Sequence, residues 1–412
     1  MTRVVITGMG AVTPLGNSTR DFLNGIFSGK VGIGPITKFD ASQTGITVAA
    51  EVKDFDPTVH VGKKAARRMD LFSQYAVDSA VSAVKQAGIE QTNTAPEDLG
   101  VIYGSGIGGL TTIQEQVIKM YTKGPQRVSP LFVPTAIANM AAGNLALRFQ
   151  AENICTAVVT ACSSGTNAIG EAYRQIKEGH AQVMLTGGAE ASINEIGIAG
   201  FAALTALSKQ TDPLKASLPF DQNRSGFVMG EGAGTLVLES LEHAQKRNAA
   251  ILGEIVGYGS TCDAYHITAP DPSGKGAARA MQQAIDEAGI QPNQVGYINA
   301  HGTATQANDA GEAKAINLVF GQNSPVKVSS TKSMTGHLLG AAGAIEAIAT
   351  IAALHEQKLP PNVGLTQQDP ACQLNLVTGN QGQEVTGLKY AISNSLGFGG
   401  HNAVLAFKKW SE

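Results

Sequence analysis

The chain has 412 residues, of which 43% are hydrophobic and 15% charged, which is enough to bury a large core in roughly two or three domains. Its formal charge of −3, without a long Lys/Arg run, argues against general nucleic-acid binding, because phosphate contacts need a concentrated basic surface. The 48 glycines and the 5% aromatic content indicate tight turns and a core of small side chains.

Cysteine usage and the start of the chain indicate a reducing cytoplasm. The cysteines lack zinc-type spacing, and the opening segment MTRVVITGMGAV lacks the succession of a secretion signal. The most apolar helical stretch, 341–354, contains Glu346 and is shorter than the ~18 consecutive apolar residues that span a membrane. We expect a cytoplasmic protein without a membrane span. The four cysteines are Cys155, Cys162, Cys262 and Cys372.

The first elements are a strand at 4–6, a helix through 22–26, an irregular stretch to about residue 63, and a helix over 68–87. A basic cluster precedes that last helix. Two interpretations stay open for the cluster: a solvated helix face, or a docking patch for an acidic partner. The cluster comprises Lys63, Lys64, Arg67 and Arg68.

A strand at 101–104 and a helix at 110–121 enclose the sequence GSGIGG, in which Gly104, Gly106 and Gly109 satisfy GxGxxG. A dinucleotide site also needs an acidic residue at the end of a second strand about 20 residues further on. KGPQRVS stands there instead. We therefore interpret these glycines as close-packed turns.

Cys162 lies between an apolar strand at 157–160 and a helix in which Ile169, Tyr173 and Ile176 recur at helical spacing. The free N–H groups and the dipole of a helix N-terminus favour the nucleophilic thiolate form of a cysteine. A buried structural cysteine is the alternative.

The rest of the chain repeats one pattern of strand, small-residue turn and helix. GFVMGEGAGTLVLE, predicted as a pair of strands, resembles GFGGHNAVLAF, and VVTACSSGT resembles VSSTKSMTG. This similarity predicts duplicated α/β halves, 1–250 and 251–412, with the nucleophile in the first. The further predicted elements are strands at 182–186, 226–239, 254–260, 295–300, 327–330 and 389–393, and helices at 276–288 and 339–354.

Two histidines of the second half also follow strands. His301 begins HGTAT, and Lys332 and His337 lie in STKSMTGH. Ligands of α/β sheets gather beyond the carboxyl ends of strands, where Cys162 is also expected. A zinc site would need ligands from three distant turns, and a Cys/His hydrolase leaves one histidine unused. A condensation uses all three, with a thiolate for the acyl group and neutral imidazoles for an enolate.

Four blocks of this sequence resemble those of the β-ketoacyl-[acyl-carrier-protein] synthases of the thiolase superfamily, especially the type II synthases of bacterial fatty-acid synthesis. The blocks are TACSSGTNAIGEA, HGTAT followed by NDAGE, STKSMTGHLLGAAG, and SNSLGFGGHN. The resemblance covers the whole chain. It implies a five-layered αβαβα thiolase-like fold, a homodimer, an acyl-carrier-protein partner, and elongation of an acyl chain by two carbons from a malonyl thioester. It implies no cofactor and no metal in the reaction.

The resemblance also implies roles for single residues. Cys162 would carry the acyl group, with its own N–H and that of Phe398 as oxyanion hole, while His301 and His337 would bind the malonyl thioester carbonyl. Lys332 would support His337. A supporting network would comprise Asp309, Glu312 and Glu346, and the acyl pocket would be lined by Ile107 and Phe201. The pantetheine arm would contact Thr303 and Thr305. Acyl carrier protein would dock on Lys64, Arg67 and Arg68.

Three positions depart from the usual family blocks: Ala304 in HGTAT, Leu396 before GFGG, and His401 in GFGGHN. None of them removes a catalytic group. Two other functions remain as alternatives. A degradative thiolase would need a second cysteine in the C-terminal turn, where this chain has GFGGHN, and a silent chain-length subunit would lack the nucleophile.

Overall fold

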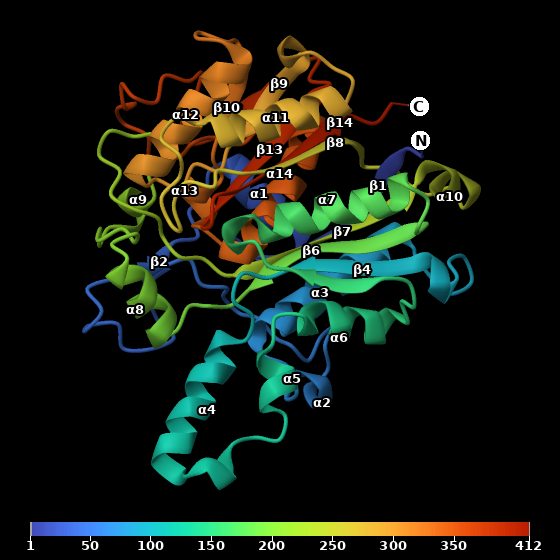
Figure 1. The fold of residues 1–412 in the computed structure, drawn as a ribbon, viewed down its shortest axis with the longest axis vertical. Helices are drawn as coiled ribbons and strands as arrows, with labels where there is room; N and C mark the ends of the chain where they lie inside the picture. The colour runs from blue at the N-terminus through green and yellow to red at the C-terminus, as the bar shows by residue number, and fades with distance from the viewer. Residues whose placement is uncertain (1, 412) are drawn as a thin grey trace.

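In a computed structural model, which describes residues 2–411, ten strands form one continuously hydrogen-bonded sheet in the order β10-β9-β13-β14-β8-β1-β7-β6-β4-β5 (Figure 1). The first half contributes β1 (Val4–Val12), β4 (Leu99–Gly104), β5 (Cys155–Val158), β6 (Val183–Glu190) and β7 (Gly232–Ser240). The second half contributes β8 (Gly253–Cys262), β9 (Val295–Asn299), β10 (Lys327–Ser329), β13 (Tyr390–Gly397) and β14 (His401–Lys408).

The two halves have the same strand topology. Outward from the junction, the orders are β1-β7-β6-β4-β5 and β8-β14-β13-β9-β10, with two antiparallel pairings followed by two parallel ones in each half. A short antiparallel pairing of Val4–Ile6 with Gly253–Ile255 joins the halves. The predicted duplication is therefore confirmed, and β7 and β14 occupy equivalent positions, as their sequence similarity indicates.

Helices cover the sheet on both sides and fill the space between its halves. The outer face of the first half carries α3 (Leu71–Ala87) and α6 (Met140–Phe149), and α11 (Lys275–Glu287) and α12 (Gln306–Phe320) form the outer layer of the second half (Figure 1). Both α7 (Ser164–Lys177) and α14 (Ala342–Glu356) contact strands of both halves. These layers give the predicted five-layered αβαβα architecture.

The remaining elements are short or peripheral. The helices are α1 (Thr19–Ser28), α2 (Lys63–Ala66), α4 (Leu110–Lys123), α5 (Phe132–Ala136), α8 (Glu195–Ala203), α9 (Pro213–Ala216), α10 (Leu241–Lys246) and α13 (Lys332–Thr335). Two small sheets pair β2 (Gly34–Pro35) with β3 (Val48–Ala49), and β11 (Lys358–Leu359) with β12 (Gln383–Glu384). In Figure 1, α4 and α5 project away from the layered body.

Several predicted elements have other bounds in the structure. The helix expected over 68–87 begins later, as α3 at Leu71, because Asp70 caps it by accepting a hydrogen bond from Phe72 N at 3.3 Å. The strand expected at 182–186 continues to Glu190, since Gly187 and Gly188 extend it. The pair of strands expected over 226–239 is the single strand β7, and residues before it make only isolated bridges.

The glycines of GSGIGG are close-packed turns, as predicted. A Cβ on Gly104 would lie 2.6 Å from the Ser164 backbone, and one on Gly106 would lie 2.6 Å from the Glu190 carboxylate. The apolar segment Leu339–Glu356 passes a composition test for a membrane span, but 89% of it is buried inside the fold, which identifies it as a core helix.

Candidate active site

Cys162 lies in a tight turn between β5 and α7. The turn is a short 3-10 helix, Ala161–Ser163, and α7 begins at Ser164, so the thiol is held at a helix N-terminus as predicted. Ala161 has φ +50°, a left-handed conformation that is strained for a residue with a Cβ. The turn directs Cys162, which is 9% exposed, into the apolar cluster that also contains Phe227.

The structure brings together residues from all four sequence blocks around one cavity of about 90 Å³. The sequence-predicted residues on its wall are Cys162, Phe201, His301, Thr303, Thr305, His337 and Phe398. Leu396 also lines it. Ile107 does not line the cavity, but it packs against the apolar cluster that contains Cys162 and Phe201.

The resting thiol differs from the expected thiolate. Burial raises the pKa of Cys162 to about 12, and this effect outweighs the nearby charge of Lys332 and a hydrogen bond from Phe398 N–H, which both lower the pKa. The helix N-terminus is present, but removing the thiolate from water is the larger effect. Cys162 is therefore protonated at neutral pH.

The two histidine rings lie against each other beside the thiol. Their centroids are 5.2 Å apart with the planes at 87°, and the ring of Phe227 packs edge-on against His337 at 5.2 Å. Burial lowers the pKa of both imidazoles well below the usual value, and Lys332 lowers both further. Both rings are therefore neutral at pH 7, and neither ring nitrogen of His337 has a hydrogen-bond partner among residues 2–411.

Lys332 contacts His301 and not His337, which corrects the expected support. Its Nζ lies 3.4 Å from His301 Nδ1 and forms a buried ion pair with Glu346. An ammonium group donates but does not accept, so Nδ1 of the neutral His301 ring is the acceptor. The proton of His301 is then on Nε2, free to be donated to a ligand.

Asp309 and Glu312 hold the backbone of the HGTAT loop and do not reach Lys332. Glu312 accepts hydrogen bonds from His301 N and Gly302 N, both at 2.8 Å. Asp309 accepts from Phe220 N at 2.8 Å and from Ala304 N at 3.2 Å. Of the three residues of the predicted network, Glu346 is the ion-pair partner of Lys332, because the carboxylates of Asp309 and Glu312, both on α12, accept backbone hydrogen bonds of the loop instead.

The turn after β13 presents Phe398 to the cavity. Gly399 and Gly400 have φ values of +87° and +76°, which a side chain would disfavour, and they turn the chain so that Phe398 N–H points at the Cys162 sulfur. The Phe398 and Phe201 ring centroids are 6.3 Å apart. Phe398 therefore lines the cavity beside Phe201 and contacts the thiol with its backbone N–H.

The three departures from the family blocks lie in different places. Ala304 is fully buried with φ +67°, and its carbonyl accepts from Gly226 N at 3.0 Å. Leu396 is on the cavity wall. His401 is absent from that wall and opposes Cys262 across the β14–β8 pair.

Within residues 2–411 no group of three or more His, Cys, Asp or Glu side chains could hold a metal ion. Behind the histidines, however, several buried polar atoms lack hydrogen-bond partners: Glu346 Oε2, both amide atoms of Asn299, and Ser393 Oγ. Asn299 and Ser393 are register partners in the β9–β13 pair, which α14 covers. Such oxygen donors suit a monovalent cation or ordered water.

The predicted docking residues lie far outside this cavity. Lys64, Arg67 and Arg68 are exposed on and after α2, and none of them forms an ion pair within the described part of the chain. A larger surface cleft, of about 1070 Å³, is lined by residues of α1 and α14 and contains no predicted site residue.

Several site residues were missed by the sequence analysis. Asp263 and Asn402 line the cavity and are joined by a 2.8 Å hydrogen bond from Asn402 Nδ2. Glu190 and Arg224 are buried behind its walls. Asn402 could have been found, because it ends the GFGGHN block, whereas Asp263 lies in an irregular loop without a recognisable pattern.

Comparison with known proteins follows the same division of the chain. Residues 1–244 match the family "Beta-ketoacyl synthase, N-terminal domain", and residues 252–366 match "Beta-ketoacyl synthase, C-terminal domain". The chain belongs to the β-ketoacyl synthase family. It is therefore an acyltransferase-type condensing enzyme, as the four sequence blocks indicate.

Full-length relatives show which type of β-ketoacyl synthase the chain is similar to. The chain is 50% identical over 410 residues to "3-oxoacyl-[acyl-carrier-protein] synthase 2" of Synechocystis sp., which covers 99% of this chain and 98% of that one. It is 51% identical over 409 residues to the protein of that name from Staphylococcus aureus, with coverage of 99% and 98%.

Solved structures of other β-ketoacyl synthases superimpose along the whole chain. "The ishigamide ketosynthase/chain length factor" has a TM-score of 0.94 at 35% identity, and a β-ketoacyl synthase from Burkholderia phymatum has 0.92 at 36%. A type II polyketide ketosynthase, solved in complex with its acyl-carrier protein, has 0.91 at 32%. Each match covers 100% of both chains.

Proposed function

We propose that this β-ketoacyl synthase condenses an acyl chain held on Cys162 with malonyl-acyl carrier protein, releasing carbon dioxide and 3-oxoacyl-acyl carrier protein in fatty-acid elongation. The observation that carries the proposal is that a thiol, two neutral imidazoles and the Phe398 N–H come together at one small cavity. This set supplies a nucleophile, proton donors for an enolate, and an oxyanion donor.

The first half-reaction transfers the acyl group. The Cys162 sulfur attacks the thioester carbonyl, the carrier thiol leaves with the proton, and the N–H groups of Cys162 and Phe398 hold the oxyanion. The thioester carries no charge at the sulfur, so the burial that raises the pKa of the thiol does not disfavour the acylated form. Removal of water from the site also protects the thioester from hydrolysis.

The second half-reaction forms the carbon–carbon bond. His301 and His337 donate hydrogen bonds to the malonyl thioester oxygen, which becomes an enolate as the carboxylate leaves as carbon dioxide. The enolate carbon then attacks the carbonyl carbon of the Cys162 thioester, and the sulfur leaves as a thiolate that takes up a proton from solvent to restore the thiol. Neutral imidazoles suit this step because decarboxylation needs donors to the developing oxyanion and no strong base.

The proposed substrates bring their own thioesters, so the reaction takes no resident cofactor. Acyl carrier protein is the proposed partner, supported by the exposed cations Lys64, Arg67 and Arg68 and by the solved ketosynthase–carrier complex of a relative. Thr303 and Thr305, whose hydroxyls are 3.0 Å apart on the cavity wall, are proposed to meet the pantetheine arm. A cytoplasmic location fits four free cysteines.

We also propose a homodimer paired through β5. This strand ends the sheet, where β4 is its one neighbouring strand in the described part of the chain, and Val159 just beyond it is 56% exposed. Leu147 of the adjacent α6 is 77% exposed. An uncovered edge strand with apolar neighbours is a site for strand pairing, and a second copy would extend the sheet across a two-fold axis.

Replacement of the nucleophile tests the proposed chemistry. Wild-type protein supplied with an acyl carrier-protein thioester and malonyl carrier protein should form the 3-oxoacyl product, which mass spectrometry detects. Cys162→Ala should abolish that product while malonyl decarboxylation continues, because the histidines are retained. Cys372→Ala, which removes a buried cysteine outside the cavity, is the control. Loss of both activities in folded Cys162→Ala would contradict the assigned roles.

A further inference from the structure

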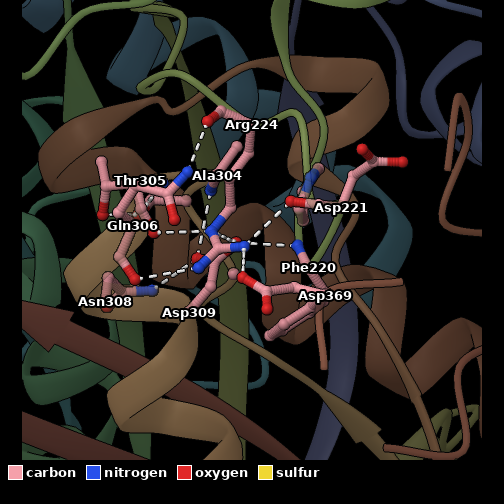
Figure 2. A network of polar contacts seen from close by, with 12 residues as sticks. Phe220, Asp221, Arg224, Ala304, Thr305, Gln306, Asn308, Asp309 and Asp369 are labelled. Atoms are coloured by element: carbon pink, nitrogen blue, oxygen red, sulfur yellow. Dashed lines mark hydrogen bonds and ion pairs between the residues drawn. The ribbon is translucent and has the colours of Figure 1, made fainter. Parts of the chain in front are cut away.

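Arg224 lies in the segment between α9 and β7, behind the cavity wall, with 1% of its side chain exposed (Figure 2). Its guanidinium donates to the carbonyl oxygens of Asp221 at 2.9 Å, Thr305 at 3.2 Å and Gln306 at 3.0 Å. It also pairs with the Asp369 carboxylate and lies 3.6 Å from Asp309. One side chain therefore joins two carboxylates to three backbone carbonyls.

Two further contacts connect the same segments. Gln306 Nε2 donates to the Arg224 carbonyl at 2.8 Å, so the two residues bind each other in both directions (Figure 2). Gly226 N donates to Ala304 O at 3.0 Å. The segment around Arg224 and the loop that leads into α12 are thus held at a fixed distance.

The two joined segments form different walls of the proposed substrate cavity. The loop carries Thr303 and Thr305, and the segment after Arg224 carries Phe227, which packs on His337. Arg224 itself is absent from the cavity wall, so it does not touch a substrate there.

Lysine could not reproduce these contacts. The guanidinium has five N–H donors in a planar fork, and here its three nitrogens all donate in different directions. A lysine ammonium would keep the charge beside Asp309 and Asp369 but would release at least one carbonyl of the loop.

We infer that Arg224 is a positioning residue that sets the spacing between the Thr303–Thr305 wall and the Phe227 wall, and thereby the binding of the pantetheine arm of the thioester substrate. The inference rests on the proposed function, because it assigns the arm to the threonine wall. It adds a residue that no sequence block contains.

The test compares wild type with Arg224→Lys on two malonyl thioesters. One carries the full pantetheine arm and the other is the S-methyl thioester, which has no arm to contact the threonine wall. We expect KM for malonyl-pantetheine decarboxylation to rise by about tenfold or more while kcat changes little, because the chemical groups are untouched. The short thioester should react equally well with both proteins. Arg127→Lys, at an exposed arginine, is the matched control.

Two further measurements decide the remaining outcomes. If Arg224→Lys does not fold by circular dichroism, Asp369→Asn removes one of the two negative charges beside the guanidinium and should raise the same KM by a smaller factor. Calorimetric titration with pantetheine alone should show weaker binding to the variant than to wild type. This titration tests the role of Arg224 even if the wild-type protein proves inactive. Inactivity of wild type would contradict the proposed function, but not the role of Arg224 in binding. Equal KM values in folded variants, or equal losses on both thioesters, would overturn the role of Arg224.

Discussion

Lys332 affects the protonation of two neighbours in the cavity at once. Its ammonium, 3.4 Å from His301 Nδ1, lowers the pKa of that ring and also lowers the pKa of the Cys162 thiol. Both effects favour the forms that the proposed reaction needs, a neutral imidazole and an ionisable sulfur. Glu346, itself fully buried, stabilises the ammonium in a place where an unpaired charge would be costly.

Loss of this charge should slow the chemistry of the thiol. Lys332→Met should raise the pKa of Cys162 and reduce its rate of alkylation by iodoacetamide at pH 8, by about tenfold for each unit of pKa. Peptide mass spectrometry over time measures the rate at each cysteine. Cys155 and Cys262 are exposed and will also be labelled, so they serve as internal references.

Lys327→Met, at a partly exposed lysine of β10, is the matched control for that measurement. An unchanged Cys162 rate in Lys332→Met would show that the ammonium does not act on the sulfur. The exposure of the other cysteines also means that selective labelling of Cys162 is not expected. Protection of Cys162 by a bound acyl group is the more specific signal.

At the scale of single residues, the sequence predicts which residues belong to the site better than it predicts which contacts they make. Cys162, His301 and His337 could be found because each follows a strand within a turn of small residues, and strand ends meet at one edge of a sheet. The partner of Lys332 could not be found, because the choice between His301 and His337 depends on side-chain directions set by tertiary packing. Arg224 has no local pattern, since all its partners but Asp221 are more than 80 residues away.

At the scale of elements, β6 ends in a carboxylate that joins two loops of the site. Glu190 accepts hydrogen bonds from Gly106 N at 2.8 Å and Gly340 N at 3.1 Å, and so connects the loop of Ile107 to the segment after His337. Burial raises the pKa of Glu190 to about 7, although the backbone N–H groups oppose the shift.

This pKa predicts a dependence of stability on pH. Folded Glu190 keeps its proton up to about pH 7, whereas the unfolded chain loses it near pH 4.5, so unfolding releases a proton between these values. The free energy of unfolding should therefore fall as pH rises through this window, by up to about 3 kcal/mol from this group. Glu190→Gln should flatten that dependence, as measured by urea denaturation from pH 5 to pH 8.

Glu195→Gln, at an exposed residue of α8, is the control for Glu190→Gln. Its stability should follow the wild-type dependence on pH. Curves for Glu190→Gln and wild type that stay parallel over the whole range would contradict the raised pKa.

A second prediction at this scale concerns α2. If its cations dock acyl carrier protein, then Lys64→Glu combined with Arg67→Glu should raise KM for carrier-bound malonyl thioester by about three- to tenfold. The effect should weaken at high salt, and kinetics with malonyl-pantetheine should not change, because that substrate has no carrier protein. Lys246→Glu on α10, elsewhere on the surface, is the control. Equal effects on both substrates would contradict docking.

The bounds of helices and strands were predicted well where a clear hydrophobic pattern runs through the element. They were predicted poorly where a turn or a capping residue sets the end of the element. The buried helix α14 and the strands β9 and β10 lie close to their expected bounds. The start of α3 depends on one capping side chain, Asp70, and the residues before β7 are held by bridges to Ala50, Leu207 and His337, which local sequence does not encode.

At the scale of the whole molecule, the proposed dimer gives a direct prediction. Val101 N binds Ile154 O and Ser105 N binds Val158 O, so the N–H and carbonyl of Ala157 point away from β4. Ala157→Pro removes that free N–H and should weaken pairing between two β5 strands. Light scattering after size exclusion should find wild type near twice 42.6 kDa and the variant shifted toward 42.6 kDa.

Ala157→Thr, which keeps the N–H, is the control and should remain dimeric. A wild type that elutes as a monomer at micromolar concentration would contradict the dimer. A dimer that Ala157→Pro leaves intact would place the interface elsewhere.

The place of β1 in the sheet has a consequence for how the chain is made. β1 lies between β7 and β8, and Val4 pairs with Ser240 on one side and Ile255 on the other. Val4 therefore has no strand partner until these later residues have been synthesised. At about 5–20 residues per second, a ribosome needs roughly 12 to 50 s to synthesise that interval. Throughout that time the fully apolar face of β1 has no sheet to join. Newly made chains should therefore depend on chaperones that bind short hydrophobic segments, and such binding should end when β7 emerges.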